Sequence, residues 1–260
     1  MKCTNCVSFL LFLSISVLFT IGACQSQEMQ ANNSNSDVDQ ASEQMLVFSK
    51  TDGFRHQSIE AGQEALQKLG EENGVGVTVT EDASMFTDEN LSGYDAVIFL
   101  NTTMTVFNGE QRDAFQAYIQ NGGGYAGIHS AADTEYDWPW YGELVGAYFD
   151  NHPPGTPNAN VLLVDSNHPS TEMLPETWNR DDEWYNYQEF EDHINVLLEL
   201  DTDSYEGSDH PDNHPIAWYH EFDGGRSFYT GLGHTEESFS DDQFLAHLWG
   251  GIQYAMGDHE

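Results

Sequence analysis

Short apolar runs alternate with amphipathic stretches from residue 44 to residue 128. The run Asp95–Leu100 is almost entirely apolar, which is typical of a parallel strand covered on both faces. The stretch Ser58–Asn73 has Ile59, Leu66 and Leu69 on one face, the spacing of a helix that packs on a sheet. The series of expected strands and helices is Gln44–Ser49, Ser58–Asn73, Gly76–Thr80, Asp95–Leu100, Glu110–Gln120 and Tyr125–Ile128. This alternation predicts an α/β fold with a doubly wound, mostly parallel sheet and helices on both faces.

The pattern changes in the second half of the chain. A short helix is expected at Trp138–Val145, followed by strands at Asn160–Val164 and Val196–Leu200. The turn sequence Asp223-Gly224-Gly225 separates two apolar runs, which predicts an added β-hairpin region. The hairpin strands and the helix expected to close the domain are Ile216–His220, Ser227–Gly231 and Asp242–Met256.

The stretch Gly122–Asp133 carries the first candidate chemistry. Three glycines end the preceding helix, and a compact apolar strand follows them. His129 and Ser130 come directly after that strand, and His56 follows the first strand of the series. Because ligands of open α/β sheets bind at the carboxyl ends of the strands, these side chains are expected at one rim of the sheet.

The first 23 residues resemble a bacterial lipoprotein signal. Lys2 precedes the apolar run Val7–Ile21, and small residues lead to Cys24. The alternative is a transmembrane anchor, but this run is short for crossing a hydrocarbon layer of ~30 Å. The sequence therefore predicts a signal peptide over residues 1–23, lipidation of Cys24 and export to a membrane surface. A polar tether is expected over residues 24–42 and one globular domain over residues 43–258.

The cysteines limit the chemistry of the exported protein. Cys3 and Cys6 lie in this leader, Cys24 is the expected lipidation site directly after it, and no cysteine follows Cys24. The Cys3-x-x-Cys6 pair is therefore interpreted as incidental. A mature chain of this kind has neither an internal disulfide nor a thiol nucleophile.

The chain is very acidic, with 44 Asp and Glu against seven Lys and Arg. Without Lys2, 44 acids face six bases, a formal charge of −38. Such a surface repels nucleic acid and anionic lipid headgroups. The acids are spread along the chain, which favours adaptation to high salt. An acidic protein from an ordinary habitat is the alternative.

Several motifs together resemble the ThuA-like (trehalose-utilisation) family, over about Met45–Met256. They are Gly53-Phe54-Arg55-His56, Gly122–Asp133, Phe149-Asp150-Asn151-His152-Pro153, Asn167-His168-Pro169, Asp182-Glu183-Trp184-Tyr185, His214-Pro215-Ile216-Ala217-Trp218, Gly225-Arg226 and Tyr229–Thr235. The resemblance implies a flavodoxin-like fold similar to class I glutamine amidotransferases. It also implies carbohydrate chemistry, with trehalose and keto-sugar derivatives as the suggested substrates.

The chain differs from the amidotransferases at the reactive turn. Those enzymes carry a nucleophilic cysteine after the central strand, whereas this chain has His129-Ser130. A serine nucleophile is disfavoured, because the spacing Gly-x-Ser-x-Gly is absent and neighbours on a sharp turn often point apart. Glutamine amidotransferase activity is therefore not expected.

Histidines and one acidic segment supply the candidate site. Histidine titrates near neutral pH, and a carboxylate beside aromatic rings can have a raised pKa. The expected acid–base residues are His129, Glu183, His56, His152 and His234, and the expected substrate-binding residues are Asp182, Trp184, Tyr185, Ser130 and Trp138. The same imidazoles and carboxylates suit zinc or iron, so a divalent metal is an open alternative. For His168, His193, His210, His220, His247 and His259 a structural role is expected.

Three classes of function are consistent with these residues. The first is a sugar-processing enzyme (a hydrolase, lyase or isomerase) that uses histidine and carboxylate groups on a trehalose-related or keto-sugar substrate. The second is a non-catalytic carbohydrate-binding surface lipoprotein, and the third is a structural or partner-binding surface protein. Titratable side chains gathered at one rim would favour the first class.

Overall fold

The computed structural model describes residues 43–210 and 213–257. The predicted signal peptide, Cys24 and the tether lie outside the described residues. Within those two described ranges, no helix is both long enough and apolar enough to cross a bilayer.

A nine-stranded sheet runs through the domain in the order β2-β1-β3-β4-β11-β10-β9-β6-β7. Strands β1, β2, β3, β4 and β11 are parallel to one another, and β10, β9, β6 and β7 continue the sheet in antiparallel fashion. The strand bounds are β1 Gln44–Phe48, β2 Gly76–Thr80, β3 Ala96–Leu100, β4 Gly124–Ile128, β6 Asn158–Leu163, β7 Thr177–Asp181, β9 Asn195–Leu200, β10 Pro215–Phe222 and β11 Gly225–Thr230. The predicted fold class is confirmed, and the antiparallel part is larger than the expected hairpin.

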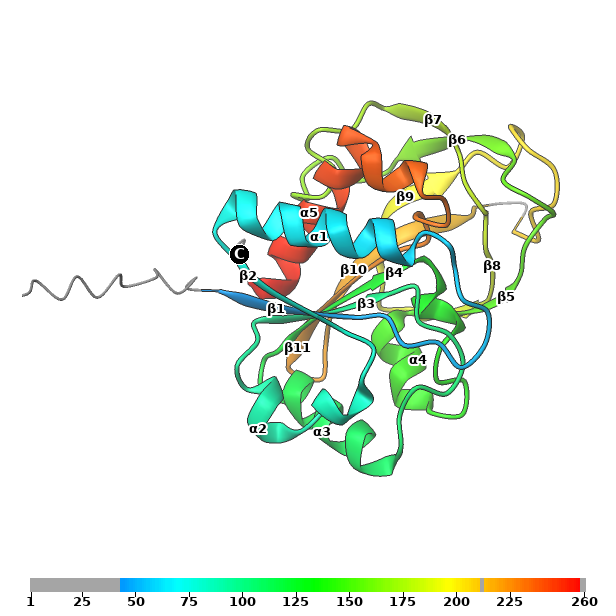
Figure 1. Cartoon of the computed structure of the whole chain (residues 1–260). Helices are drawn as coiled ribbons and strands as arrows, with labels where there is room; N and C mark the ends of the chain where they lie inside the picture. The colour runs from blue at the N-terminus through cyan, green and yellow to red at the C-terminus, as the bar shows by residue number, and fades with distance from the viewer. Residues whose placement is uncertain (1–42, 211–212, 258–260) are drawn as a thin grey trace, which may run out of the picture. The chain divides into compact units, whose positions relative to one another are not determined.

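Helices cover both faces of the sheet (Figure 1). Helices α1 and α5 lie on one face, and α2, α3 and α4 lie on the other. The helix bounds are α1 Ile59–Asn73, α2 Asp88–Leu91, α3 Gly109–Gln120, α4 Pro139–Val145 and α5 Asp242–Met256, with 3-10 turns at Ala83–Met85, His129–Asp133 and Glu237–Ser240. The central strands β3 and β4 are buried at every position, as strands covered on both faces must be.

The sequence did not predict three strands, β5 (Ala147–Asn151), β7 and β8 (Asn186–Phe190). The motif Phe149–Pro153 begins at the end of β5, and His152 lies in the loop that follows. Strands β5 and β8 pair only with each other in a small antiparallel sheet, and β7 is the last strand of the large one. Strands at such positions carry polar residues on their exposed sides, so their composition resembles that of loops.

Candidate functional site

Three histidines follow parallel strands at the same edge of the large sheet. His56 lies in the loop after β1, His129 directly follows β4, and His234 lies in the loop after β11. Because β1, β4 and β11 all run in the same direction, their carboxyl ends share this edge. The topology therefore brings together residues that are far apart in sequence.

His129 stands at the sharp turn after the central strand. Its backbone has φ = 49°, a left-handed conformation that non-glycine residues seldom adopt outside constrained sites. Its Nδ1 lies 2.8 Å from the carbonyl oxygen of Gly231, and its own carbonyl accepts a hydrogen bond from the Tyr229 hydroxyl. A carbonyl oxygen only accepts, so Nδ1 carries a proton and Nε2 faces the site.

The carboxylate of Glu183 faces these histidines. Its Oε2 lies 3.3 Å from Nε2 of His129 and 3.1 Å from Nδ1 of His234, and its Oε1 lies 3.2 Å from Nδ1 of His152. Nδ1 of His234 is 3.3 Å from Nε2 of His129. These distances place three of the expected histidines in contact with Glu183.

His56 packs against two of these histidines. Its ring centroid lies 4.9 Å from that of His129 and 5.1 Å from that of His234, in both cases edge to face. Its Nδ1 is 3.2 Å from the Ser130 hydroxyl. Burial and the neighbouring imidazoles lower the pKa of His56 to about 2, so His56 is neutral.

The charges of Glu183 and His234 depend on each other. Burial alone would raise the pKa of Glu183, but hydrogen bonds to His129 and His234 lower it below its usual range. Burial lowers the pKa of His234, but the hydrogen bond and the charge of Glu183 outweigh burial and raise this pKa above its ordinary value. Glu183 is therefore ionised in this arrangement and keeps a proton on His234.

Asp182 positions the loop that carries His234. It is fully buried and accepts hydrogen bonds from the backbone amides of Gly233 and His234 and from Arg180. Gly233 has φ = 109°, which allows the chain to turn there. Asp182, expected to bind substrate, is instead a positioning residue, since these partners occupy its oxygens.

The aromatic residues expected to bind substrate lie in three different places. Tyr185 packs on His129 with ring centroids 4.3 Å apart, as a wall of the site would. Trp184 is fully buried and donates its indole hydrogen to the carbonyl of Pro157, so it belongs to the core. Trp138 stacks on Trp140, whose indole donates to Asp223 in the β10–β11 turn, beyond the opposite end of β11. The structure does not bring Trp184 or Trp138 to the histidines.

Two aromatic contacts at the site were not predicted. Phe54 lies edge to face with His56 at 4.9 Å, and its side chain is one of the most exposed large apolar groups, at 65%. Phe149 packs on Tyr185 at 4.2 Å. Both stand in motifs that also contain a candidate histidine, and an aromatic residue shortly before that histidine is the signal in the sequence.

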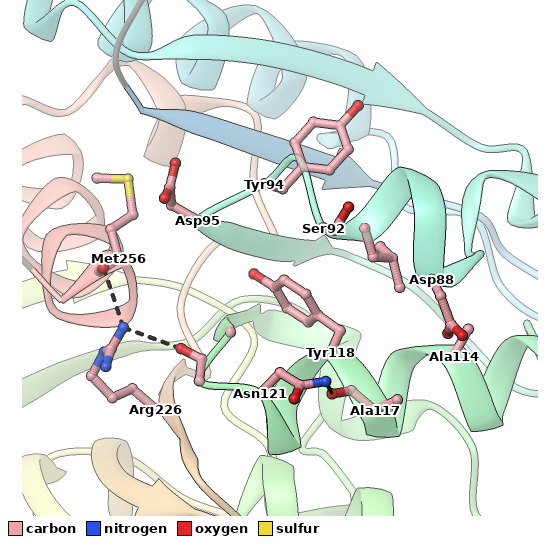
Figure 2. Close-up of a pocket in the computed structure, with 13 residues that line it drawn as sticks. Asp88, Ser92, Tyr94, Asp95, Ala114, Ala117, Tyr118, Asn121, Arg226 and Met256 are labelled. Atoms are coloured by element: carbon pink, nitrogen blue, oxygen red, sulfur yellow. Dashed lines mark hydrogen bonds between the residues drawn. The ribbon is translucent and has the colours of Figure 1, made fainter.

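A cavity of about 530 Å³ lies at the other edge of the sheet (Figure 2). Its lining includes Tyr94, Asp95 and Arg226. Arg226 donates to the carbonyls of Gly122, Ala255 and Met256, which caps the end of α5. Because this guanidinium is occupied by backbone groups, the cavity lacks a converging reactive set.

Histidines elsewhere in the fold have structural surroundings. Burial lowers the pKa of His220 to about 4 and that of His247 to about 3. Nδ1 of His247 is paired with a backbone carbonyl. His214, whose pKa is lowered to about 4, is paired with the carbonyl of Tyr185 and contacts Tyr205. A structural role was expected for His220 and His247, and these surroundings agree with it.

The clustered donors suit proton transfer and also metal ligation. One donor atom from each of His56, His129, Glu183 and His234 lies within 4.8 Å of the other three. An ionised carboxylate in contact with a protonated imidazole forms an acid–base pair. Imidazole and carboxylate are equally the ligands of zinc and non-haem iron.

Known structures have the same fold as this chain. A ThuA-like protein from Bacteroides uniformis ATCC 8492 superposes with a TM-score of 0.71 at 24% identity, covering 82% of this chain and 91% of its own. A ThuA-like protein from Parabacteroides merdae ATCC 43184 gives a TM-score of 0.62 at 19% identity, with 83% and 90% covered. A beta-galactosidase from Bacillus circulans sp. alkalophilus gives 0.53 at 13% identity, covering 83% of this chain and 31% of its own.

No curated protein matches the chain in sequence. The family model described as trehalose utilisation matches residues 44–255, which is the whole described domain apart from a few terminal residues. The match contains every histidine of the cluster and Glu183, and it agrees with the structural neighbours. The chain therefore belongs to the ThuA, or trehalose utilisation, family.

Proposed function

We propose that this protein is a sugar-processing enzyme whose histidine–carboxylate cluster transfers a proton on a trehalose-related or keto-sugar substrate. The observation that supports it best is the contact of one ionised carboxylate, Glu183, with three histidines at the carboxyl edge of the sheet. Proton transfer needs a base and an acid within hydrogen-bonding distance of one reacting atom, and such a set supplies both.

The roles follow from the charges. Glu183 is the proton acceptor, since it is the ionised group in contact with the histidines. His234 is the proton donor, since Glu183 raises its pKa and so favours its protonated form. His129 is fixed by Gly231 and Tyr229 and orients the carboxylate. A hydrogen on the carbon next to a sugar carbonyl is the substrate position that such a pair could exchange.

Exposed apolar side chains near the cluster suit a sugar ligand. Phe54 is 65% exposed next to His56. Tyr136 is 36% exposed and donates to Asp133, four residues beyond His129. Aromatic rings stack on the apolar faces of pyranoses, so Phe54 is the residue that we expect to contact the sugar.

Hydrogen exchange tests the proposal directly. Trehalose and its 3-keto derivative would be incubated with the protein in deuterated buffer, and loss of the ring C–H signals would be followed by NMR. We expect exchange of the hydrogens next to the carbonyl with the wild type, and a loss with Glu183→Gln. Saturable sugar binding without exchange or turnover would favour the alternative, a carbohydrate-binding surface lipoprotein.

We further propose that the domain is exported and anchored through a lipid on Cys24. The support is the sequence of the leader alone. Cys24→Ala should release the protein from the membrane fraction or leave it as precursor. A variant that stays membrane-bound after salt and carbonate washes would contradict the anchor.

A further inference from the structure

We propose that His129, His234 and Glu183, together with His56, bind one divalent transition-metal ion, and that zinc suits the site best. The inference rests on the proposed function in one respect, because it places the ion where the sugar oxygen would react. The ion would polarise that oxygen as a Lewis acid. Glu183 Oε2 would then be a ligand, and its role as proton acceptor would belong to the metal-free site.

The spacing of three donor atoms supports the proposal. Oε2 of Glu183, Nε2 of His129 and Nδ1 of His234 are separated by 3.1, 3.3 and 3.3 Å. Zinc binds nitrogen and oxygen ligands at ~2.0–2.1 Å, so neighbouring donors of a tetrahedral site lie about 3.3 Å apart. The three atoms thus already have the separations of one face of a zinc tetrahedron.

The three imidazole rings have the matching arrangement. The centroids of His56, His129 and His234 form a triangle with sides of 4.9, 5.1 and 5.2 Å, and each pair meets edge to face. Rings bound through nitrogen to one tetrahedral zinc have centroids about 5 Å apart. His56 pairs through Nδ1 with Ser130, which leaves Nε2 for the fourth position.

The chemistry of the donors is a second reason. One carboxylate and two imidazoles bring their donor atoms to the same point. Nδ1 of His129 is paired with the carbonyl of Gly231, so Nε2 is the atom that remains to bind an ion. One divalent cation attracts all three donor atoms.

The surrounding hydrogen bonds leave the donor atoms directed inward. Gly231 holds His129 Nδ1, and Ser130 holds His56 Nδ1. Nδ1 of His152 faces two acceptors, Oε1 of Glu183 and the carbonyl of Pro153, so it carries a proton and fixes the carboxylate from outside. Metal-binding histidines usually donate their other nitrogen in this way, which orients the ring.

Metal titration tests the inference without any sugar. The full chain would be purified in detergent without an affinity tag, treated with chelator, and titrated with Zn²⁺ by calorimetry in excess Mg²⁺, which saturates the acidic surface. We expect one Zn²⁺ per chain. His234→Gln and Glu183→Gln should each weaken the affinity by ~100-fold or more. The matched control is His193→Gln, an exposed histidine outside the cluster, which should bind as the wild type does.

Equal zinc binding by the wild type, His234→Gln and Glu183→Gln would overturn the proposal, because the acidic surface would then account for it. A second measurement needs no variant. Co²⁺ added to the wild type should give the visible absorption of a tetrahedral site, and the absence of such a band would also overturn the proposal.

These results can be separated from those on the proposed function. Hydrogen exchange that depends on Glu183 in a protein that binds no zinc would overturn the metal site and leave the proposed function standing. One zinc bound per chain with no turnover on any sugar would leave the metal site standing and contradict the enzyme.

Discussion

The two edges of the parallel sheet differ in what their polar groups contact. At the amino edge, beside the cavity of about 530 Å³, Arg226 and Tyr118 are paired with backbone carbonyls. At the carboxyl edge, the side chains of Glu183, His129 and His234 face one another. A group paired with backbone stabilises the fold, whereas groups that converge on one point are available to a ligand.

Backbone conformation separates the two edges less clearly. At the carboxyl edge, Asn101 and His129 adopt left-handed φ values of 51° and 49° directly after β3 and β4. At the amino edge, Gly122 and Gly224 are left-handed, where glycine avoids the steric cost, but so is Asp223 in the β10–β11 turn, with φ = 50°. The convergence of side chains therefore distinguishes the edges better than backbone strain does. We call the amino edge the structural edge and the carboxyl edge, which carries the proposed site, the functional edge.

The largest expected effect comes from removing the carboxylate at the functional edge. Glu183→Gln keeps the size of the side chain but removes the proton acceptor. We expect exchange or turnover to fall by ~10²–10⁴-fold, the usual contribution of a general base. NMR exchange rates would measure the loss, and circular dichroism would verify the fold. A variant with nearly full activity would mean that the cluster is not the reactive centre.

A buried positioning residue should have the next largest effect. Asp182→Asn replaces an acceptor with an amide that directs hydrogens at Gly233 N, His234 N or Arg180. Leaving Arg180 without its buried partner should cost about 3 kcal/mol of unfolding free energy. Urea unfolding would measure this, and exchange rates should fall as well because the loop carrying His234 is displaced. An unchanged urea midpoint would contradict the positioning role.

At the structural edge we expect a substitution to lower stability and leave activity unchanged. Arg226→Gln removes charged hydrogen bonds to Gly122, Ala255 and Met256, which should cost about 2 kcal/mol of stability. The folded variant should catalyse hydrogen exchange at the same rate as the wild type. Urea unfolding and the exchange assay at low temperature would separate the two quantities. A loss of activity without a loss of stability would place function at this edge.

Much of the fold could be predicted, because the parallel strands are apolar at nearly every position. The convergence of His56 and His129 followed from that topology. The position of His234 could not be derived from topology, since the hairpin pattern of β10 and β11 does not reveal that β11 lies parallel to β4. That pairing, for example Tyr229 with Gly127, joins residues far apart in the chain.

The segment Asp182–Tyr185 shows what local sequence could not decide. In an extended chain, successive side chains point to opposite sides. Glu183 and Tyr185 contact the histidines, while Asp182 and Trp184 are turned toward buried backbone groups. The composition indicated a functional segment, but which alternate residues face the site depends on packing between distant strands. Trp184 and Trp138, which we expected to contact substrate, pack elsewhere in the fold.

Salt should affect the stability of both edges equally. The acids that give the chain its formal charge of −37 are spread along the sequence, so their repulsion should weaken the whole domain rather than one edge. Raising the salt concentration from 0.01 M to 1 M shortens the screening length from ~30 Å to ~3 Å. The thermal midpoint should therefore rise, and by the same amount in the wild type, Glu183→Gln and Arg226→Gln. A flat or falling midpoint in the wild type would contradict adaptation to high salt, and a rise confined to one variant would show that the charge stress is concentrated at that edge.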